Sequence, residues 1–503
     1  MKYNSKTLFS ISIAIFFTPI LAFLNRINLP QILSIDIYFI FFFQLLFCAV
    51  IFILSFISHK IFFKKYLDLA PFFLVNSILF YLLFFFNHFK ILFFDKQNFY
   101  LDEIIILLIY LIIYFFLIRI SKNKIDFLVR FIFIFIILQI VNFSINFYKV
   151  QGKTIETTNQ IPKDNLTTFN IQSLKNNPKN ENIYFIILDG MMSLDSAMRL
   201  KIIKNKTKII QDLNKNGMQY NKNFFSNYDQ TYLSITSLLQ GSYPVTNNSE
   251  RYTSRRNFFP SSIINQNKDN DFFKILRKTN KKFFWLGNSW AGCLNNIYIN
   301  CIDSNHLTKL VSRTMLFYYD SIFVYIFNYI LDTDQTYSSI EFFNNFNLPK
   351  SNNSIYLIHV MSPHPPFFFD KNCKVDLKSD SIKINSEVEN YTYAYNCLMD
   401  IIMKWSRDTN DSMIFIFGDH GWSFNRDYMN KNKVDSYENR FKAFFSYKTP
   451  ARCKGIEIPN SIVNIMRFAL ICSGNKEVEY LQDFKFRTFS ENNPDYGKVI
   501  LIN

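Results

Sequence analysis

Two apolar runs that end abruptly in an acidic residue beside glycine constrain the fold of this chain most strongly. Residues 186–190 read IILDG, and residues 415–421 read FIFGDHG. Strands of this kind are typical of a buried parallel sheet that carries its chemistry at the carboxyl edge. Asp189, Asp419 and His420 would meet at that edge, where their oxygen and nitrogen atoms could bind a divalent metal ion.

The alternative interpretation is that these polar residues only make turns. Asp189 precedes a glycine and could be a turn residue or a helix cap. A turn also accounts for Gly418 and Asp419, because glycine permits tight turns and close approach of the backbone. It does not account for His420, which stands between Asp419 and a second glycine. A metal role is therefore the stronger hypothesis for the second run.

The first 150 residues are rich in apolar side chains. They contain five long apolar segments, at about 8–24, 34–57, 70–87, 103–118 and 127–146. Each approaches the roughly 20 residues that a helix needs to cross a bilayer. We therefore predict a transmembrane helical domain at residues 1–148, a polar linker at 149–181, a soluble domain at 182–490 and a C-terminal tail at 491–503.

Basic residues alternate between the loops that join these segments. They precede the first segment and lie between the second and third and between the fourth and fifth: Lys2, Lys6, Lys60, Lys64, Lys65, Arg119, Lys122 and Lys124. Basic loops stay in the cytoplasm, so the N-terminus is predicted inside. An odd number of spans then places the soluble domain outside. The sequence thus predicts a multi-pass protein of the cytoplasmic (inner) membrane with a periplasmic or extracellular soluble domain.

The cysteines agree with this topology. Cys48 lies in the second apolar segment, and the other six lie in the part predicted to be external. An even number of cysteines in an oxidising compartment indicates disulfides. Proximity in sequence favours Cys293–Cys301, Cys373–Cys397 and Cys453–Cys472, although six cysteines allow 15 pairings.

The net charge of +16 at pH 7 does not indicate nucleic-acid binding. Lysine is spread along the whole chain together with Asn, Ile and Phe, and no cluster of Lys and Arg marks a binding face. We therefore predict a solvated basic surface and no nucleic-acid partner. A surplus of lysine could also favour anionic lipid or polysaccharide.

From residue 182 onward the pattern alternates between strands and helices. Strands are predicted at 183–188, 283–287, 355–360 and 413–417, and helices at 193–215, 231–240, 270–279, 388–406 and 461–471. This alternation predicts an α/β domain with a mostly parallel, doubly wound sheet. The aromatic stretch 305–347 is predicted to be either a helical insert lying against the membrane part or core packing.

Three further side chains have a functional and a structural interpretation each. Thr231 begins a predicted helix, either as its N-cap or as a nucleophile at the positive end of the helix dipole. His364 lies in a rigid Pro-His-Pro-Pro run and could act as an acid, a base or an anion donor. His359 fits a buried structural role almost as well. Together with Arg440, the two histidines form the predicted substrate-binding set.

The combined motifs resemble the sulfatase-like branch of the alkaline phosphatase superfamily in its membrane-anchored form. That group includes lipid A phosphoethanolamine transferases and lipoteichoic acid synthases. The resemblance is carried by the strand ending in Asp189, the helix start with Thr231 and Ser234, and residues 418–421, and it covers roughly residues 182–490 plus the anchor.

The resemblance implies one divalent metal ion (Zn, Mn, Mg or Ca) held by Asp189, Thr231, Asp419 and His420, with Thr231 as the nucleophile. It further implies transfer of a phospho-substituent, such as phosphoethanolamine or glycerol phosphate, to a cell-surface glycan or lipid through a covalent threonine intermediate. Membrane lipid and surface glycan would be the substrates. One alternative is a sulfuric or phosphoric ester hydrolase acting on surface polysaccharide. Another is a non-catalytic scaffold, against which the four intact residues argue.

Two departures from the family pattern bear on the chemistry. The transferases usually have Glu at the first metal position, whereas this chain has Asp189, as do the nucleotide pyrophosphatases and the ethanolamine phosphate transferases of lipid anchors. True sulfatases carry a Cys/Ser-x-Pro-x-Arg motif, which is absent at residues 231–235. The name sulfatase would therefore describe the fold better than the chemistry.

Overall fold

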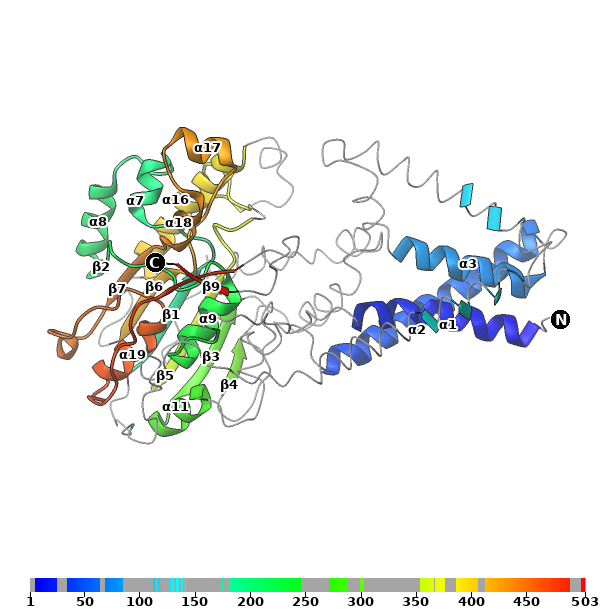
Figure 1. Cartoon of the computed structure of the whole chain (residues 1–503), viewed down its shortest axis with the longest axis horizontal. Helices are drawn as coiled ribbons and strands as arrows, with labels where there is room; N and C mark the ends of the chain where they lie inside the picture. Colours follow the sequence, from blue (N-terminus) through cyan, green and yellow to red (C-terminus); the bar gives the residue numbers. More distant parts are fainter. Residues whose placement is uncertain are drawn as a thin grey trace. The chain divides into compact units, whose positions relative to one another are not determined.

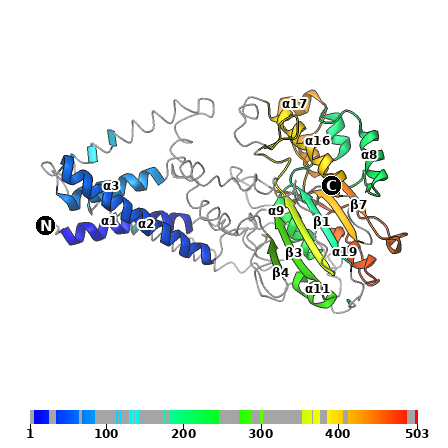
Figure 2. The same cartoon turned by 180° about the vertical axis from the view of Figure 1, so that it is seen from behind.

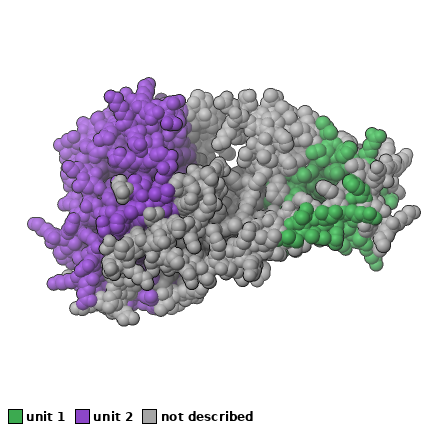
Figure 3. All heavy atoms as spheres, viewed as in Figure 1, with its two compact units in different colours: residues 1–154, 307–333 green, residues 155–306, 334–503 purple. Residues whose placement is uncertain are grey.

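The computed structural model describes the chain in several stretches. These are residues 5–24, 34–63, 68–84, 181–245, 271–287, 299–302, 353–365, 367–375, 386–405, 412–488 and 499–502, together with residue 174 and isolated helical residues between 112 and 141. The chain divides into two compact units (Figure 3), one of residues 1–154 and 307–333 and one of residues 155–306 and 334–503. The aromatic stretch 305–347 lies outside the described residues.

The described part of the first unit contains three apolar helices, each of which corresponds to one of the predicted apolar segments (Figure 1). They are α1 (Ser5–Leu24), α2 (Ser34–Ser58) and α3 (Leu69–Phe84), and a π-helical turn, His59–Phe63, follows α2. Within the described part of the chain, one helix is long and apolar enough to cross a membrane, at Ile40–Ile61. The predicted segments 103–118 and 127–146 are described only at isolated residues, so the five-helix domain stays a prediction.

The three helices pack through aromatic rings and through polar contacts between helices. Phe16 of α1 stacks on Phe80 of α3 with 4.0 Å between ring centroids. Gln44 of α2 donates to the carbonyl of Phe16 at 2.5 Å. Contacts of this kind are common between membrane helices, because lipid offers polar groups no partner. The outer face of α2 remains apolar and exposed, as at Leu45, which is 58% exposed. Such a surface fits a lipid environment better than water.

The second unit is built on a seven-stranded mixed sheet with the order β2-β7-β6-β1-β5-β3-β4. Five neighbouring strands run parallel: β6 (Met413–Gly418), β1 (Ile183–Leu188), β5 (Ser354–Val360), β3 (Lys282–Gly287) and β4 (Ile299–Ile302). β7 (Phe445–Lys448) and β2 (Gln219–Tyr220) extend one edge by antiparallel pairing. β8 (Lys485–Thr488) and β9 (Val499–Ile502) form a separate antiparallel pair.

Helices cover both faces of the sheet (Figure 1, and from behind in Figure 2). Phe185 and Ile187 of β1 face the core that contains α9 (Thr231–Gln240), α11 (Asp271–Thr279) and α19 (Val463–Cys472). Tyr184 and Ile186 face the core that contains α7 (Leu194–Arg199), α8 (Lys206–Lys215) and α16 (Glu387–Trp405). The alternation of side chains along the strand thus supplies two hydrophobic cores, and the expectation of an α/β domain covered on both faces is confirmed.

Two of the three predicted disulfides are formed. Cys373–Cys397 and Cys453–Cys472 have Cα separations of 5.3 Å and 5.0 Å. Cys48 is unpaired within the first unit. The side chains of Cys293 and Cys301 lie outside the described residues.

The disulfide Cys453–Cys472 lies beside an ion pair at the entry to β1, in which the carboxylate is buried and the arginine is exposed. The carboxylate of Glu181, which is 5% exposed, pairs with Arg452 and accepts a hydrogen bond from Ser473 Oγ at 2.6 Å. The carbonyl of Glu181 accepts a hydrogen bond from Lys281 Nζ at 2.9 Å. Arg452 directly precedes one disulfide cysteine and Ser473 directly follows the other. The disulfide therefore joins the two segments that fix the chain where it enters the sheet.

Candidate active site

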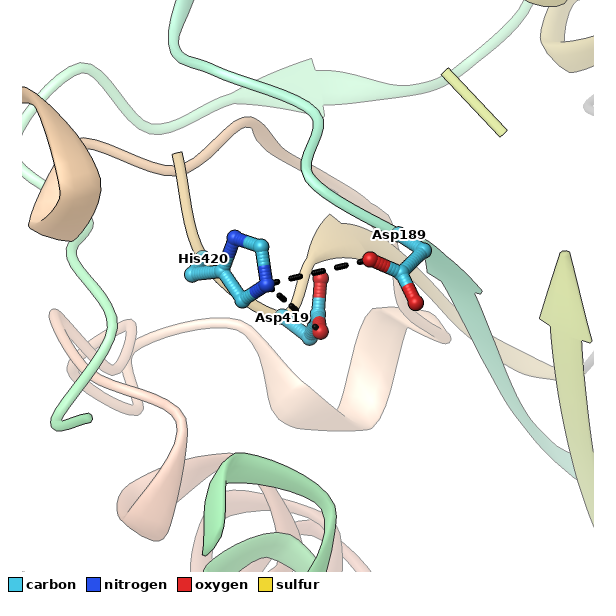
Figure 4. A group of neighbouring side chains, drawn as sticks. All are labelled: Asp189, Asp419 and His420. Atoms are coloured by element: carbon cyan, nitrogen blue, oxygen red, sulfur yellow. Dashed lines mark ion pairs between the residues drawn. The ribbon is translucent and has the colours of Figure 1, made fainter. Parts of the chain in front are cut away.

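The register of the sheet brings the two predicted acidic residues together. β1 and β6 are neighbouring parallel strands, and Leu188 pairs with Gly418. Asp189 and Asp419 are the next residues of the two strands, so they leave the sheet at the same edge. Asp189, Asp419 and His420 place ligand atoms within 4.8 Å of one another (Figure 4). His420 Nε2 lies 3.5 Å from Asp419 Oδ2 and 3.7 Å from Asp189 Oδ1.

Two carboxylate oxygens in this cluster lack a hydrogen-bond donor. Asp189 and Asp419 are 2% and 0% exposed. One oxygen of each carboxylate has a polar partner. Asp189 Oδ2 lies 3.2 Å from His359 Nε2, and Asp419 Oδ1 accepts a hydrogen bond from the amide of Gly190 at 2.9 Å. The other two, Asp189 Oδ1 and Asp419 Oδ2, are buried without a hydrogen-bond partner among the described residues. Buried unpaired anions are costly, so the arrangement fits a bound cation.

The electrostatic environment of Asp189 and His420 favours the protonation states that bind a metal ion. Burial by itself would raise the pKa of Asp189, but the hydrogen bond from His359 and the nearby histidines lower it below its usual value. Burial, and secondly the charge of Arg440, lowers the pKa of His420. His420 Nδ1 lies 2.8 Å from the carbonyl of Gly421, which accepts a hydrogen bond from Nδ1–H and so leaves the lone pair of Nε2 directed at the cluster.

Thr231 is the first residue of α9, and its side chain reaches the same cluster. Thr231 Oγ1 lies 3.2 Å from His420 Nε2. Gln230 occupies the N-cap position and makes no side-chain cap hydrogen bond, so Thr231 does not have the N-cap position that the alternative interpretation required. Its hydroxyl lies at the positive end of a helix of ten residues, where an anion is stabilised.

Ser234, the second hydroxyl of the helix start, is buried away from the cluster. Its Oγ lies 3.1 Å from Ser226 Oγ and 3.3 Å from the carbonyl of Tyr228. Ser226 Oγ in turn donates to the carbonyl of Asp419 at 2.6 Å. These contacts give Ser234 a structural role in the loop that precedes α9.

Both glycines that flank Asp419 and His420 are required by the close approach of other backbone segments. A Cβ on Gly418 would lie 2.2 Å from the carbonyl oxygen of Met191, and a Cβ on Gly421 would lie 2.0 Å from that of Asn439. The sequence-based interpretation of these glycines as sites of close backbone approach is confirmed. The packing also fixes where the loop between them can lie.

Replacing Gly421 with alanine should destabilise the protein by about 3 kcal/mol, because the backbone of one segment must move to admit the Cβ. Thermal unfolding of the full chain in detergent measures the change. Gly455→Ala is the matched control, since a Cβ there meets no atom within 4 Å and only the φ of +89° opposes the substitution. A loss at Gly421 no larger than the loss at Gly455 would contradict the close packing.

The two predicted substrate-binding histidines both contact Asp189. His359, in β5, is fully buried, and its contact with the Asp189 carboxylate favours the structural interpretation. The amide of His364 donates to the carbonyl of Asp189 at 3.0 Å. The His364 ring is only partly buried and lies edge-on to Trp422, with 4.9 Å between centroids. A role of His364 toward substrate stays a prediction.

Arg440, the third predicted substrate-binding residue, lies near the end of α18 (Ser436–Phe441). Its Nη2 donates to the carbonyl of Asp229 at 2.7 Å, and the guanidinium carbon lies 5.6 Å from the centroid of the Trp422 ring. The prediction of substrate binding stays untested. The contact with Asp229 was not predicted.

Two aromatic residues that support the site were missed by the sequence analysis. Tyr391 of α16 donates to the carbonyl of Gly190 at 2.8 Å. Trp422 lies over Tyr391 with 6.1 Å between ring centroids, and its indole N–H donates to Glu387 at 3.2 Å. Trp422 directly follows the motif at 418–421, and this position could have indicated a role at the site. Tyr391 belongs to a helix that carries no local signal of function.

Comparison with known proteins finds similar solved structures. No protein-family model matches the chain, and the search of curated proteins gives no significant match. The integral membrane protein lipooligosaccharide phosphoethanolamine transferase A from Neisseria meningitidis is 11% identical over 88% of this chain and 90% of that one, with a TM-score of 0.38. The lipoteichoic acid synthase LtaP from Listeria monocytogenes is 14% identical over 67% of this chain and 84% of that one, with a TM-score of 0.34.

A third similar structure is the C-terminal periplasmic domain of EptC from Escherichia coli. It is 10% identical over 65% of this chain and 94% of that one, with a TM-score of 0.37. These structures come from the same group of proteins that the motifs at Asp189, Thr231 and residues 418–421 resemble.

Proposed function

We propose that the chain is a membrane-anchored, metal-dependent enzyme that transfers a phospho-substituent from a membrane lipid to a cell-surface glycan or lipid through a covalent intermediate on Thr231. One observation carries the proposal. The Thr231 hydroxyl lies 3.2 Å from His420 Nε2, beside two buried carboxylate oxygens that find no donor within the described part of the chain. A hydroxyl at a helix N-terminus next to a cation site has the surroundings of an activated nucleophile.

Asp189, Asp419, His420 and Thr231 would hold one divalent metal ion. Their donor set of carboxylate and hydroxyl oxygen with one imidazole nitrogen suits Zn, Mn, Mg or Ca to different degrees. When bound, the ion would lower the pKa of the threonine hydroxyl and offset charge on the phosphoryl oxygens. His359 and the amide of Gly190 would keep the two carboxylates oriented toward the site.

The residues of the chain then account for two successive transfers. Thr231 Oγ1 forms a bond to the donor phosphorus while the bond from phosphorus to the donor alcohol breaks, and the hydroxyl proton leaves with that alcohol. In the second transfer an acceptor hydroxyl forms the new bond to phosphorus, and its proton returns to Thr231 as the threonine–phosphorus bond breaks. His364 is the candidate to carry the proton, because its ring is partly exposed while its amide is bound to Asp189.

Mass spectrometry of the trapped enzyme tests this proposal most directly. The full chain in detergent is incubated with a bacterial lipid extract and a divalent metal salt, quenched in acid, and the peptide that contains Thr231 is sequenced. We expect an adduct on Thr231 whose mass identifies the transferred group. Addition of a surface glycan should discharge the adduct onto glycan, whereas a hydrolase would discharge it to water at the same rate with or without glycan. Turnover with unmodified Thr231 would contradict a covalent mechanism.

The proposed reaction requires the second unit to lie outside the cytoplasm. An alkaline-phosphatase reporter fused after Lys153 should therefore be active, because this reporter folds only in an oxidising compartment. A fusion in the basic loop at residues 58–69 should be inactive. The opposite pattern, with activity only in the 58–69 fusion, would overturn the topology.

A further inference from the structure

The C-terminal end of α18 contacts both loops that carry the candidate catalytic residues. The carbonyl of Arg440 accepts the amide of Gly421 at 2.7 Å, directly after His420. The carbonyl of the next residue, Phe441, accepts the amide of Ser226 at 2.8 Å, in the loop that leads to Thr231. One short backbone segment therefore connects the His420 loop to the start of the Thr231 loop.

The side chain of Arg440 extends this connection toward the nucleophile. Its Nη2 bonds to the carbonyl of Asp229, two residues before Thr231, at 2.7 Å. A hydrogen bond from a guanidinium is charge-assisted and is stronger than one between neutral groups. Asp229 is also held from β8, because its Oδ1 accepts the amide of Thr488 at 3.1 Å and the Thr488 hydroxyl at 2.7 Å. The peptide just before Thr231 is thus fixed by its carbonyl and by its side chain.

These contacts lead to an inference that rests on the proposed function and deepens it. We propose that Arg440 is a positioning residue, which sets the location of Thr231 Oγ1 relative to Asp189, Asp419 and His420 by holding the carbonyl of Asp229. It would act through the loop backbone. This differs from the role read from the sequence, in which the guanidinium binds the substrate anion directly.

Kinetics of two Arg440 variants separate the two roles. The full chain in detergent is loaded with Zn²⁺, and release of nitrophenol from bis(p-nitrophenyl) phosphate is measured. Arg440→Met should lower kcat about 100-fold, the effect of a displacement near 1 Å, with KM little changed. Arg440→Lys should keep much of the rate, because an ammonium can still donate to the Asp229 carbonyl. Free guanidinium ion should partly restore Arg440→Met. A raised KM at unchanged kcat would instead establish substrate binding and overturn the positioning role.

Hydrogen exchange gives a readout that does not depend on activity. Amides of residues 226–234 should exchange faster in Arg440→Met than in the wild-type protein, at equal zinc content. Arg426→Met, which removes an exposed arginine of α17 (Arg426–Lys431), is the matched control and should change nothing. Unchanged exchange in Arg440→Met would overturn the inference. A wild-type protein that releases no nitrophenol and forms no adduct on Thr231 would instead refute the proposed function, while the exchange data still decide the role of Arg440.

Discussion

Thr231→Ala should lower transfer by at least about a thousandfold while lowering metal affinity much less than the loss of Asp419 or His420 does, because the hydroxyl is the one proposed ligand that is neutral and only weakly basic. The variant lacks the hydroxyl that lies 3.2 Å from His420 Nε2 but keeps both carboxylates and the imidazole of the cluster. Turnover, metal content and a melting curve are measured on one preparation. Because Gln230 occupies the N-cap position, the loss of Thr231 should cost little stability.

Two further variants serve as controls for this result. Thr231→Ser keeps a hydroxyl at the helix N-terminus and should retain part of the activity. Ser234→Ala should lower stability by about 1 kcal/mol, because it removes the contact between Ser234 and Ser226, and should leave the activity of each folded molecule near normal. Normal specific activity in Thr231→Ala would exclude the covalent mechanism.

Asp419→Asn and His420→Ala should each lower metal affinity by at least about 100-fold, because loss of an outer partner of a ligand already costs about 10- to 100-fold. Metal content of the purified variants and titration with Zn²⁺ measure the change. Asp427→Asn on the exposed face of α17 is the matched control and should bind metal normally. Wild-type metal content in Asp419→Asn or His420→Ala would refute the proposed ligand set.

Asp419→Asn should also change the stability of the metal-free protein. In the metal-free protein, Asp419 Oδ2 and Asp189 Oδ1 are buried near each other, and no donor reaches them from the residues that the structure describes. Like charges at close range are unfavourable, so Asp419→Asn should raise the melting temperature of the metal-free protein. Added Zn²⁺ should raise the melting temperature of the wild type and have little effect on the variant. An equal response of both proteins to Zn²⁺ would place the metal elsewhere.

Sequence patterns located the elements that carry the candidate site. β1 covers the predicted strand at residues 183–188, and α9 covers the predicted helix at 231–240. The chain changes sharply from apolar to polar at Asp189, and from polar to largely apolar directly after Thr231, so a local signal marks each boundary. Because parallel strands end at a common edge, the meeting of Asp189 with Asp419 and His420 could also be predicted.

Features that depend on tertiary contacts could not be predicted in this way. β7 has four residues, of which Ser446 and Lys448 are polar, and its antiparallel pairing with β6 depends on its partner. The predicted helix at 193–215 is divided into α7 and α8, and the Asn205 side chain caps the start of α8. The hydrogen bond from Arg440 to the carbonyl of Asp229 joins residues 211 positions apart, so no local sequence pattern predicts it.

The contacts that hold the Glu181 carboxylate bear on the order of export and folding. Arg452 and Ser473 bind the Glu181 carboxylate, and they lie next to Cys453 and Cys472 in the sequence. The disulfide between these cysteines persists only in an oxidising compartment. A chain still in the reducing cytosol would lack the disulfide that joins the segments of Arg452 and Ser473. The strand that ends in Asp189 would then be held less firmly at its start. In the proposed topology, export and full assembly of the sheet would therefore be coupled, and the protein would reach its final stability on the side of the membrane where its proposed substrates are found.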